Sequence, residues 1–163
     1  MQCDCNRKAM RLKNFDYSFH GSYFVTICCQ NRQPLFGKID NHKMINKWWH
    51  KIPKKFPTVN IGEFVTMPDH FHAIVSVGST PCGRPGHTAP SHMDGHMGPS
   101  IQKIIAWFKT MTTNEYIRNV KNNNWQPFND KLWQRSYHDR FIRNKTEYYS
   151  IKEYIINNPR HHK

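Results

Sequence analysis

Two strand-like segments follow one another almost directly in the middle of the chain, and their spacing limits the folds available to it. Val59–Thr66 has a strand-like composition. The run HFHAIVSV, His70–Val77, shows the apolar alternation of a strand. Only residues 67–69 separate the two segments, and Pro68 is placed where a strand can begin. The spacing therefore predicts an antiparallel hairpin.

The second segment carries two histidines, His70 and His72, with one phenylalanine between them. Side chains two residues apart on a strand point to the same face, so both imidazoles are predicted to stand side by side. Two such nitrogens can bind a metal ion or a phosphate group. Histidines on strands are more often surface or half-buried residues whose hydrogen bonds are satisfied. These two residues alone therefore do not establish a binding site.

The remaining elements follow from composition and periodicity. Residues 23–32 and 131–143 are predicted as strands, and residues 40–56, 100–120 and 144–159 as helices. The resulting order is strand, helix, strand, strand, helix, strand, helix. It favours an α+β fold: a ferredoxin-like or RRM-like four-stranded antiparallel sheet with two helices on one face, plus an appended C-terminal helix. Other α+β layouts remain open.

Apolar stripes and capping residues locate the first two helices. Their stripes comprise Met44, Ile45, Trp48, Trp49 and Ile52 in the first, and Ile101, Ile104, Ile105, Phe108 and Met111 in the second. Asp40 or Asn41 is the expected cap of the first helix, and Ser100 of the second. Both stripes are interpreted as core.

Length and charge bound the class of protein. The 163 residues predict a single domain, 1–163, with a basic N-terminal arm at 1–16 and a Gly-, Pro- and His-rich surface loop at 79–99. Lys and Arg number 24 against 11 Asp and Glu, a net charge of +13 that favours a polyanionic partner. We expect no membrane partner, since no apolar run reaches the roughly 18 residues of a spanning helix. Without a signal peptide, a cytoplasmic location is expected.

The cysteines and the loop histidines are not expected to form a site. Five cysteines are an odd number and a poor disulfide framework. A zinc site using Cys3 and Cys5 with a loop histidine fits no standard ligand spacing, so reduced, uninvolved thiols are favoured. Three histidines in a segment rich in Gly and Pro are also poor candidates; these are His87, His92 and His96.

The last predicted helix adds an oxygen-bearing pair. Asn144 and Glu147 form a capping box at its start, and Tyr154 and Asn158 are four residues apart, so they share a helix face. A phenol and a carboxamide facing two imidazoles would offer a nucleophile, one hard oxygen ligand and two nitrogen ligands. This set suits phosphoryl transfer on a diester, with a divalent ion neutralising charge in the transition state. Singly, each residue has an ordinary explanation, such as packing or a helix stop.

Together the motifs resemble those of the REP-associated tyrosine transposases, within the single-tyrosine HUH transposase superfamily. His70-Phe71-His72 has the form of the HUH motif of that superfamily, histidine, bulky hydrophobic, histidine. The resemblance covers nearly the whole length, in the segments RLKNFDYSFHGSYFVTICCQNR, MPDHFHAIV, WFKTMTTNEYIR and LWQRSYHDRFIRNKTEYYSIKEYIINNP.

The resemblance implies a metal-dependent nuclease and strand transferase that acts on single-stranded DNA beside a small hairpin. It implies Mg²⁺ or Mn²⁺ as cofactor, His70, His72 and Asn158 as metal ligands, and Tyr154 as the nucleophile that leaves a 5′-phosphotyrosine and a free 3′-OH. Tyr137, on a predicted strand, is not favoured as the nucleophile. A bacterial, nucleoid-associated location is implied too.

Basic residues in two parts of the chain are candidates for DNA binding. These are Arg7, Arg11 and Lys13 in the arm, and Arg135, Arg140, Arg143 and Lys145 near the predicted site. A non-catalytic basic nucleic-acid-binding module on the same fold is the alternative, and a phosphodiesterase that uses activated water is a third. A site within one chain and a homodimer that exchanges its last helix both remain open.

Overall fold

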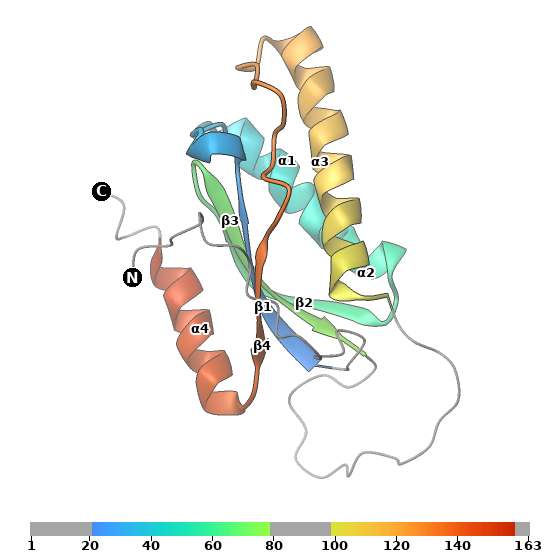
Figure 1. The fold of residues 1–163 in the computed structure, drawn as a ribbon, viewed down its shortest axis with the longest axis vertical. Helices are drawn as coiled ribbons and strands as arrows, with labels where there is room; N and C mark the ends of the chain where they lie inside the picture. The colour runs from blue at the N-terminus through green and yellow to red at the C-terminus, as the bar shows by residue number, and fades with distance from the viewer. Residues whose placement is uncertain (1–20, 79–98, 159–163) are drawn as a thin grey trace.

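The computed structural model describes residues 21–78 and 99–158, which form one antiparallel sheet and its covering helices (Figure 1). The elements are β1 (Gly21–Cys28), η1 (Gln30–Arg32), α1 (Ile39–His50), α2 (Ile52–Lys55), β2 (Val59–Thr66), β3 (His70–Val77), α3 (Ile101–Asn123), β4 (His138–Ile142) and α4 (Lys145–Asn157). The predicted basic arm and nearly all of the predicted 79–99 loop lie outside the described residues.

The described strands pair in the order β2-β3-β1-β4, and every pairing is antiparallel. This order is that of a split βαβ arrangement, and the predicted α+β class with a four-stranded antiparallel sheet is confirmed. The β2–β3 hairpin is also confirmed, with the N–H of Met67 donating to the carbonyl of His70 at 2.8 Å. In the β1–β3 register, Cys28 lies opposite His70 and Thr26 opposite His72.

The helices divide between the two faces of the sheet (Figure 1). The helices α1 and α3 pack together on one face, and α4 contacts β2 and β3 from the other. Alternation along β3 sends Phe71 and Val75 into the large core under α1 and α3, and Ile74 into a small cluster under α4. His70 and His72 have the same parity as Ile74, so they face the α4 side.

The first predicted helix is wrong in two details. Residues 40–56 form two helices instead of one, because Pro53 has no N–H to continue the ladder and α2 restarts with proline in its first turn. The N-cap position belongs to Lys38, whose carbonyl accepts from the N–H of His42 at 3.3 Å. Asn41 lies inside the helix, and its side-chain amide donates to the carbonyl of Leu35. The Ser100 cap of α3 is confirmed, with its Oγ accepting from the N–H of Lys103 at 3.4 Å.

The first and the last predicted strands are shorter than expected. The segment 131–143 forms a regular strand only over β4; before it, Trp133 forms an isolated bridge with Cys29, and Lys109 Nζ donates to three backbone carbonyls. Its acceptors are Gln134, Arg135 and Ser136 at 2.8, 3.3 and 3.1 Å. Burial lowers the pKa of Lys109 to about 8. The segment 23–32 ends as a strand at Cys28 and turns sharply through η1.

A glycine lets α4 lie close to the sheet. A Cβ added at Gly62 would lie 3.1 Å from Ile74 Cβ and 3.2 Å from Tyr148 Oη, so a larger residue would push the helix outward. Next to it, Glu63 pairs with Lys152 of α4 at 2.5 Å. Burial alone would raise the pKa of Glu63, but the hydrogen bond and charge of Lys152 outweigh it and lower that pKa. The sheet thus fixes the helix that carries Tyr154.

Candidate active site

The two histidines of β3 form the centre of the candidate site. Their side chains emerge on the α4 face and are 5% and 2% exposed for His70 and His72. The ring centroids lie 4.6 Å apart with the planes at 78°, so the imidazoles are neighbours, as the spacing predicts. A pair so buried needs polar partners, because an unsatisfied ring nitrogen is costly away from water.

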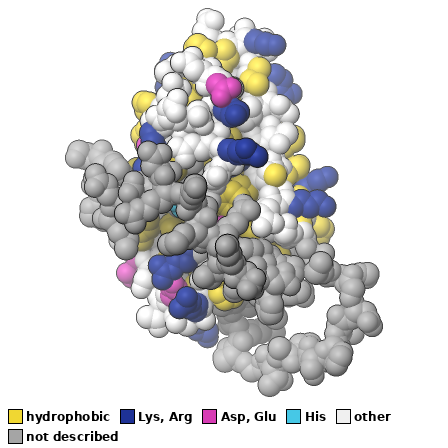
Figure 2. Space-filling model, viewed as in Figure 1, with side chains coloured by type: hydrophobic (Ala, Val, Ile, Leu, Met, Phe, Trp, Pro, Cys, Tyr) yellow, Lys and Arg dark blue, Asp and Glu magenta, His cyan; other side chains and the backbone are white. Residues whose placement is uncertain are grey.

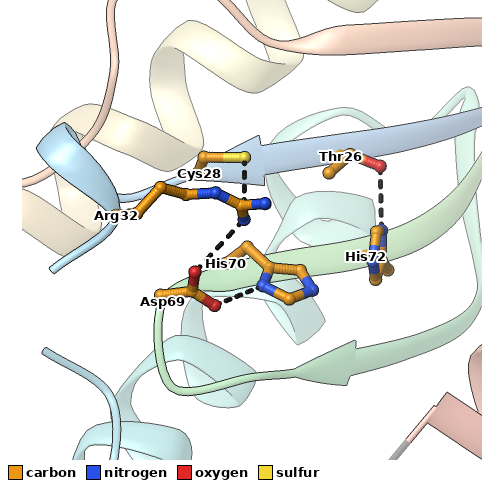
Figure 3. Close-up of polar contacts among 6 residues, drawn as sticks. All are labelled: Thr26, Cys28, Arg32, Asp69, His70 and His72. Carbon is orange, nitrogen blue, oxygen red and sulfur yellow. Dashed lines mark hydrogen bonds and ion pairs between the residues drawn. The ribbon is translucent and has the colours of Figure 1, made fainter. Parts of the chain in front are cut away.

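Each ring has a partner at Nδ1 (Figure 3). His70 Nδ1–H donates to Asp69 Oδ1 at 2.5 Å, and Asp69 Oδ2 lies 3.2 Å from Arg32 Nη1. His72 Nδ1 lies 2.8 Å from Thr26 Oγ1 on the neighbouring strand. Because Nδ1 is engaged in both rings, Nε2 is the atom through which each could bind a cation.

Tyr154 of α4 joins the histidines from across the face. Its ring centroid lies 5.6 Å from that of His72 at 68°, and 6.1 Å from that of Phe24 at 87°. Phe24 in turn stacks on His72, with centroids 5.4 Å apart and planes at 21°. Tyr154 is 41% exposed, so its phenol borders both an imidazole and solvent. A single chain brings these residues together.

Asn158 ends α4 one helical turn after Tyr154. Its φ and ψ of −54° and −43° continue the helix, as the shared-face prediction requires. The side chain is 4% exposed, and its Nδ2 is buried without a hydrogen-bond partner in the described part of the chain. The Nδ2 group is a hydrogen-bond donor, so a partner for it would be an acceptor such as a phosphate oxygen, whereas a bond to a cation would use Oδ1.

The side chains at this site could supply some, but not all, of the ligands of a divalent cation. Within residues 21–78 and 99–158, no group of three or more His, Cys, Asp or Glu side chains gathers around one point. The candidate donors on this face are the imidazoles of His70 and His72, and a neutral oxygen from Asn158 stays a prediction. Mixed nitrogen and oxygen donors suit Mn²⁺ and are compatible with Mg²⁺, with water or a substrate phosphate supplying the remaining ligands.

A groove of about 850 Å³ lies beside these residues, lined by side chains of α4 and of the strands β1, β3 and β4. It is lined by Phe24, Thr26, His72, Arg140, Arg143, Asn144, Thr146, Glu147, Ser150, Ile151 and Tyr154. Arg140 pairs with Glu147 at 2.5 Å, and the N–H of Arg143 donates to the same carboxylate at 2.9 Å. The Arg143 N–H and the Arg140 charge lower the pKa of Glu147, so it remains ionised at neutral pH.

The predicted DNA-binding residues do not all lie at this groove. Arg140 and Arg143 line it, and Lys145 is the exposed first residue of α4. Arg135 instead lines a separate groove of about 400 Å³ beside α3. Arg7, Arg11 and Lys13 lie outside the described residues.

Basic side chains are spread over much of the described surface. On the face shown in Figure 2, Lys and Arg side chains occur at both ends of the molecule, and Asp and Glu side chains are few. The full chain carries a net charge of +13, so this surface is suited to a polyanion. Among the described helices, none combines the length and the apolar character needed to cross a membrane.

Tyr137 lies away from the candidate site, in the core under α1 and α3. It is 9% exposed, and Lys109 Nζ lies 5.5 Å from its ring centroid. No role in the site was predicted for Phe24, Thr26 or Arg32, although all three contribute to it. The β1–β3 register brings Phe24 and Thr26 there, and the turn after β1 brings Arg32. Neither periodicity nor a short motif carries that signal.

Comparison with known proteins places the chain in a family. An uncharacterized protein of Haemophilus influenzae is 34% identical to the chain, over 94% of this chain and 88% of that protein. The chain belongs to the same family as that protein. No profile of a known protein family matches the chain.

Two solved structures share its fold. A REP-associated tyrosine transposase bound to a REP hairpin matches with a TM-score of 0.62 and 20% identity, over 92% of this chain and 73% of that one. A candidate transposase from Deinococcus radiodurans matches with a TM-score of 0.50 and 14% identity, over 90% and 95% of the two chains. The structural match to REP-associated tyrosine transposases predicted from the motifs is thus confirmed, as a shared α+β fold.

Proposed function

We propose that this protein is a DNA transposase, a metal-dependent single-strand endonuclease and strand transferase with Tyr154 as its nucleophile. The observation that carries the proposal is the 5.6 Å contact between the Tyr154 and His72 rings, beside a second buried histidine. Binding alone does not require a phenol, two oriented imidazoles and a buried carboxamide on one face. The transposase fold supports the same reaction class.

The roles of the residues follow from their positions. His70, His72 and Asn158 would hold Mg²⁺ or Mn²⁺. When bound, such an ion polarises a phosphate and neutralises charge that develops on it. Phe24, stacked on His72 and edge-on to Tyr154, fixes the two rings and excludes water from one side of them. The partly exposed Tyr154 hydroxyl is accessible to a strand lying in the groove.

The covalent step exchanges one phosphodiester for another. Tyr154 Oη attacks the phosphorus, its proton passes to solvent, the P–O3′ bond breaks, and the departing 3′ oxygen takes up a proton. The products are a 5′-phosphotyrosine and a free 3′-OH. Because the phosphoester is kept, attack by another 3′-OH can rejoin the strand.

Charge and shape favour a single strand next to a hairpin as substrate. The groove admits a flexible strand, and Arg140 and Arg143 can contact its phosphates once it enters. The related transposase was solved with a hairpin bound, which supports the same substrate class for this chain.

The test is formation of a covalent adduct. A pool of single-stranded oligonucleotides, each with a hairpin flanked by random sequence and a fluorophore at the 3′ end, is incubated with the full chain and Mn²⁺ or Mg²⁺. A labelled protein band should survive denaturing electrophoresis and disappear with EDTA. In the Tyr154→Phe protein this band should fall below about one hundredth of the wild-type amount. Tyr149→Phe, altered at an exposed tyrosine on the same helix, is the matched control and should retain the band.

The other outcomes separate the rival functions. A band of unchanged intensity in Tyr154→Phe would remove this residue from its role. Cleaved fragments with free 5′ ends and no adduct would indicate a phosphodiesterase that uses water. Binding without cleavage in either metal would leave the non-catalytic nucleic-acid-binding module.

A further inference from the structure

The chain turns sharply after β1, and this turn carries Arg32 to the histidine pair. Asn31 and Arg32 have φ values of 53° and 55°, a left-handed conformation that residues other than glycine rarely adopt. The guanidinium is thereby directed back along β1, where Nη1 lies 3.7 Å from Cys28 Sγ and 3.2 Å from Asp69 Oδ2. Two successive residues in this conformation are typical of places where function constrains the backbone.

The backbone around Asp69 is held independently of this ion pair. The N–H of Cys29 donates to the carbonyl of Asp69 at 2.8 Å, and the N–H of Phe36 donates to the carbonyl of Pro68 at 2.8 Å. The turn between β2 and β3 is therefore already tied to the end of β1. The contact from Arg32 to the Asp69 side chain must do something besides closing the turn.

We propose that Arg32 and Asp69, together with Thr26, are positioning residues that orient the two imidazoles towards a divalent cation. Arg32 holds the Asp69 carboxylate against His70, and the hydroxyl of Thr26 contacts His72 Nδ1 from the adjacent strand (Figure 3). The inference rests on the proposed function, since it concerns the same His70 and His72.

The chemistry follows from what a carboxylate can do. A carboxylate only accepts hydrogen bonds, so its contact at 2.5 Å fixes the proton of His70 on Nδ1 and leaves the lone pair on Nε2. The hydroxyl of Thr26 lies 2.8 Å from His72 Nδ1 and can accept from it, and with the proton on Nδ1 the lone pair of His72 is also on Nε2. A divalent cation requires both lone pairs, and partners of this kind commonly change metal affinity by about 10- to 100-fold.

The test measures Mn²⁺ binding to the full chain, by calorimetry and by the electron paramagnetic resonance signal of free Mn²⁺, without DNA. Asp69→Ala should weaken Mn²⁺ affinity by about 10- to 100-fold. The near-isosteric Asp69→Asn and Thr26→Val should give smaller losses, of about three- to tenfold. Asp40→Ala, altered at an exposed aspartate of α1, is the matched control and should bind as wild type.

A double-mutant cycle separates positioning from a general structural role. If Arg32 acts through Asp69, Arg32→Ala should weaken Mn²⁺ binding in the wild-type background and add almost nothing in the Asp69→Ala background. Thermal unfolding without metal shows whether each variant is folded. If Arg32→Ala is unfolded, Arg32→Lys, which keeps the charge without the fork, replaces it in the cycle and should show the same lack of additivity.

Failure of this inference and failure of the proposed function give different results. If His72→Ala abolishes Mn²⁺ binding while folded Asp69→Ala and Arg32→Ala bind as wild type, the positioning role is overturned and the metal site stands. Additive losses in the cycle overturn it too. If His72→Ala also binds Mn²⁺ as wild type, the metal site of the proposed function is overturned, and the positioning role with it.

Discussion

The two faces of the sheet bury different chemistry. Under α1 and α3, large aromatic side chains such as Trp49, Phe71 and Phe108 are fully buried and contact one another, with centroids 4.9 to 5.3 Å apart. Under α4, the buried apolar cluster of the described residues consists of Ile74, Ile142 and Ile155. Partly buried hydrophobic side chains such as Phe24 and Ile151 pack against this cluster, and the buried polar side chains of Thr26, His70 and His72 lie on the same face.

The aromatic face under α1 and α3 contributes mainly to stability, and the polar face under α4 carries the candidate reactive groups. Apolar burial is the dominant favourable contribution to folding, whereas buried polar groups contribute little unless fully paired. The α1 and α3 face can therefore stabilise the whole domain, which allows the α4 face to hold groups that are costly to bury. Substitutions on the two faces should then affect different measurements.

The largest loss of stability is expected on the aromatic face. Phe108 is fully buried between Trp49 and Phe71, so Phe108→Ala should lower the free energy of unfolding by about 3–5 kcal/mol in urea denaturation. Adduct formation per folded molecule should stay near wild type. A loss below about 1 kcal/mol would mean that this face is not the main source of stability.

A smaller loss of stability with a larger loss of activity is expected under α4. Ile155 is 1% exposed and follows Tyr154 directly, so Ile155→Ala should lower stability by about 2 kcal/mol and loosen the helix that holds the nucleophile. Adduct formation per folded molecule should fall several-fold. The neighbouring Ile156 is 54% exposed, and Ile156→Ala should change stability by less than about 0.5 kcal/mol. Equal effects of the two variants would contradict the packing described here.

The smallest effect concerns the start of α4 and depends on pH. The Arg143 N–H and the Arg140 charge lower the pKa of Glu147 from its usual 4.5, so its stabilisation is complete above that value and is lost as pH falls through the lower folded pKa. Glu147→Gln should therefore reduce stability by about 0.5 kcal/mol or less at pH 7, because solvent screens the pair. The difference from wild type should shrink as the pH falls below 4.5. If the stability difference between Glu147→Gln and wild type grew as the pH fell, the predicted direction of the pKa shift of Glu147 would be wrong.

Local signals in the sequence predicted much of the α4 face. The hairpin follows from the three-residue gap before His70, and the start of α4 follows from Asn144, whose Oδ1 accepts from the N–H of Glu147 at 2.8 Å. The contact of Tyr154 with His72 was expected from the motifs together. Each of these depends on residues close in sequence or on a combination of short patterns.

Other features depend on contacts between distant segments. Thr26 reaches His72 only through the β1–β3 register. Lys109 donates to backbone carbonyls of the predicted 131–143 strand that are 25 or more residues away in the sequence. Arg32 reaches Asp69 from a left-handed conformation that arginine rarely adopts. Periodicity describes one segment at a time, so it does not predict such contacts.

The most direct test of the central claim is to find which tyrosine carries the DNA. The adduct is digested with nuclease and trypsin, and the peptide bearing the nucleotide remnant is identified by mass spectrometry. Tyr154 lies in the tryptic peptide 153–160, apart from Tyr148 and Tyr149 in 146–152 and from Tyr137 in 136–140. We predict the remnant on 153–160. A remnant on either of the other two peptides would contradict the assignment of the active site to the α4 face beside His72.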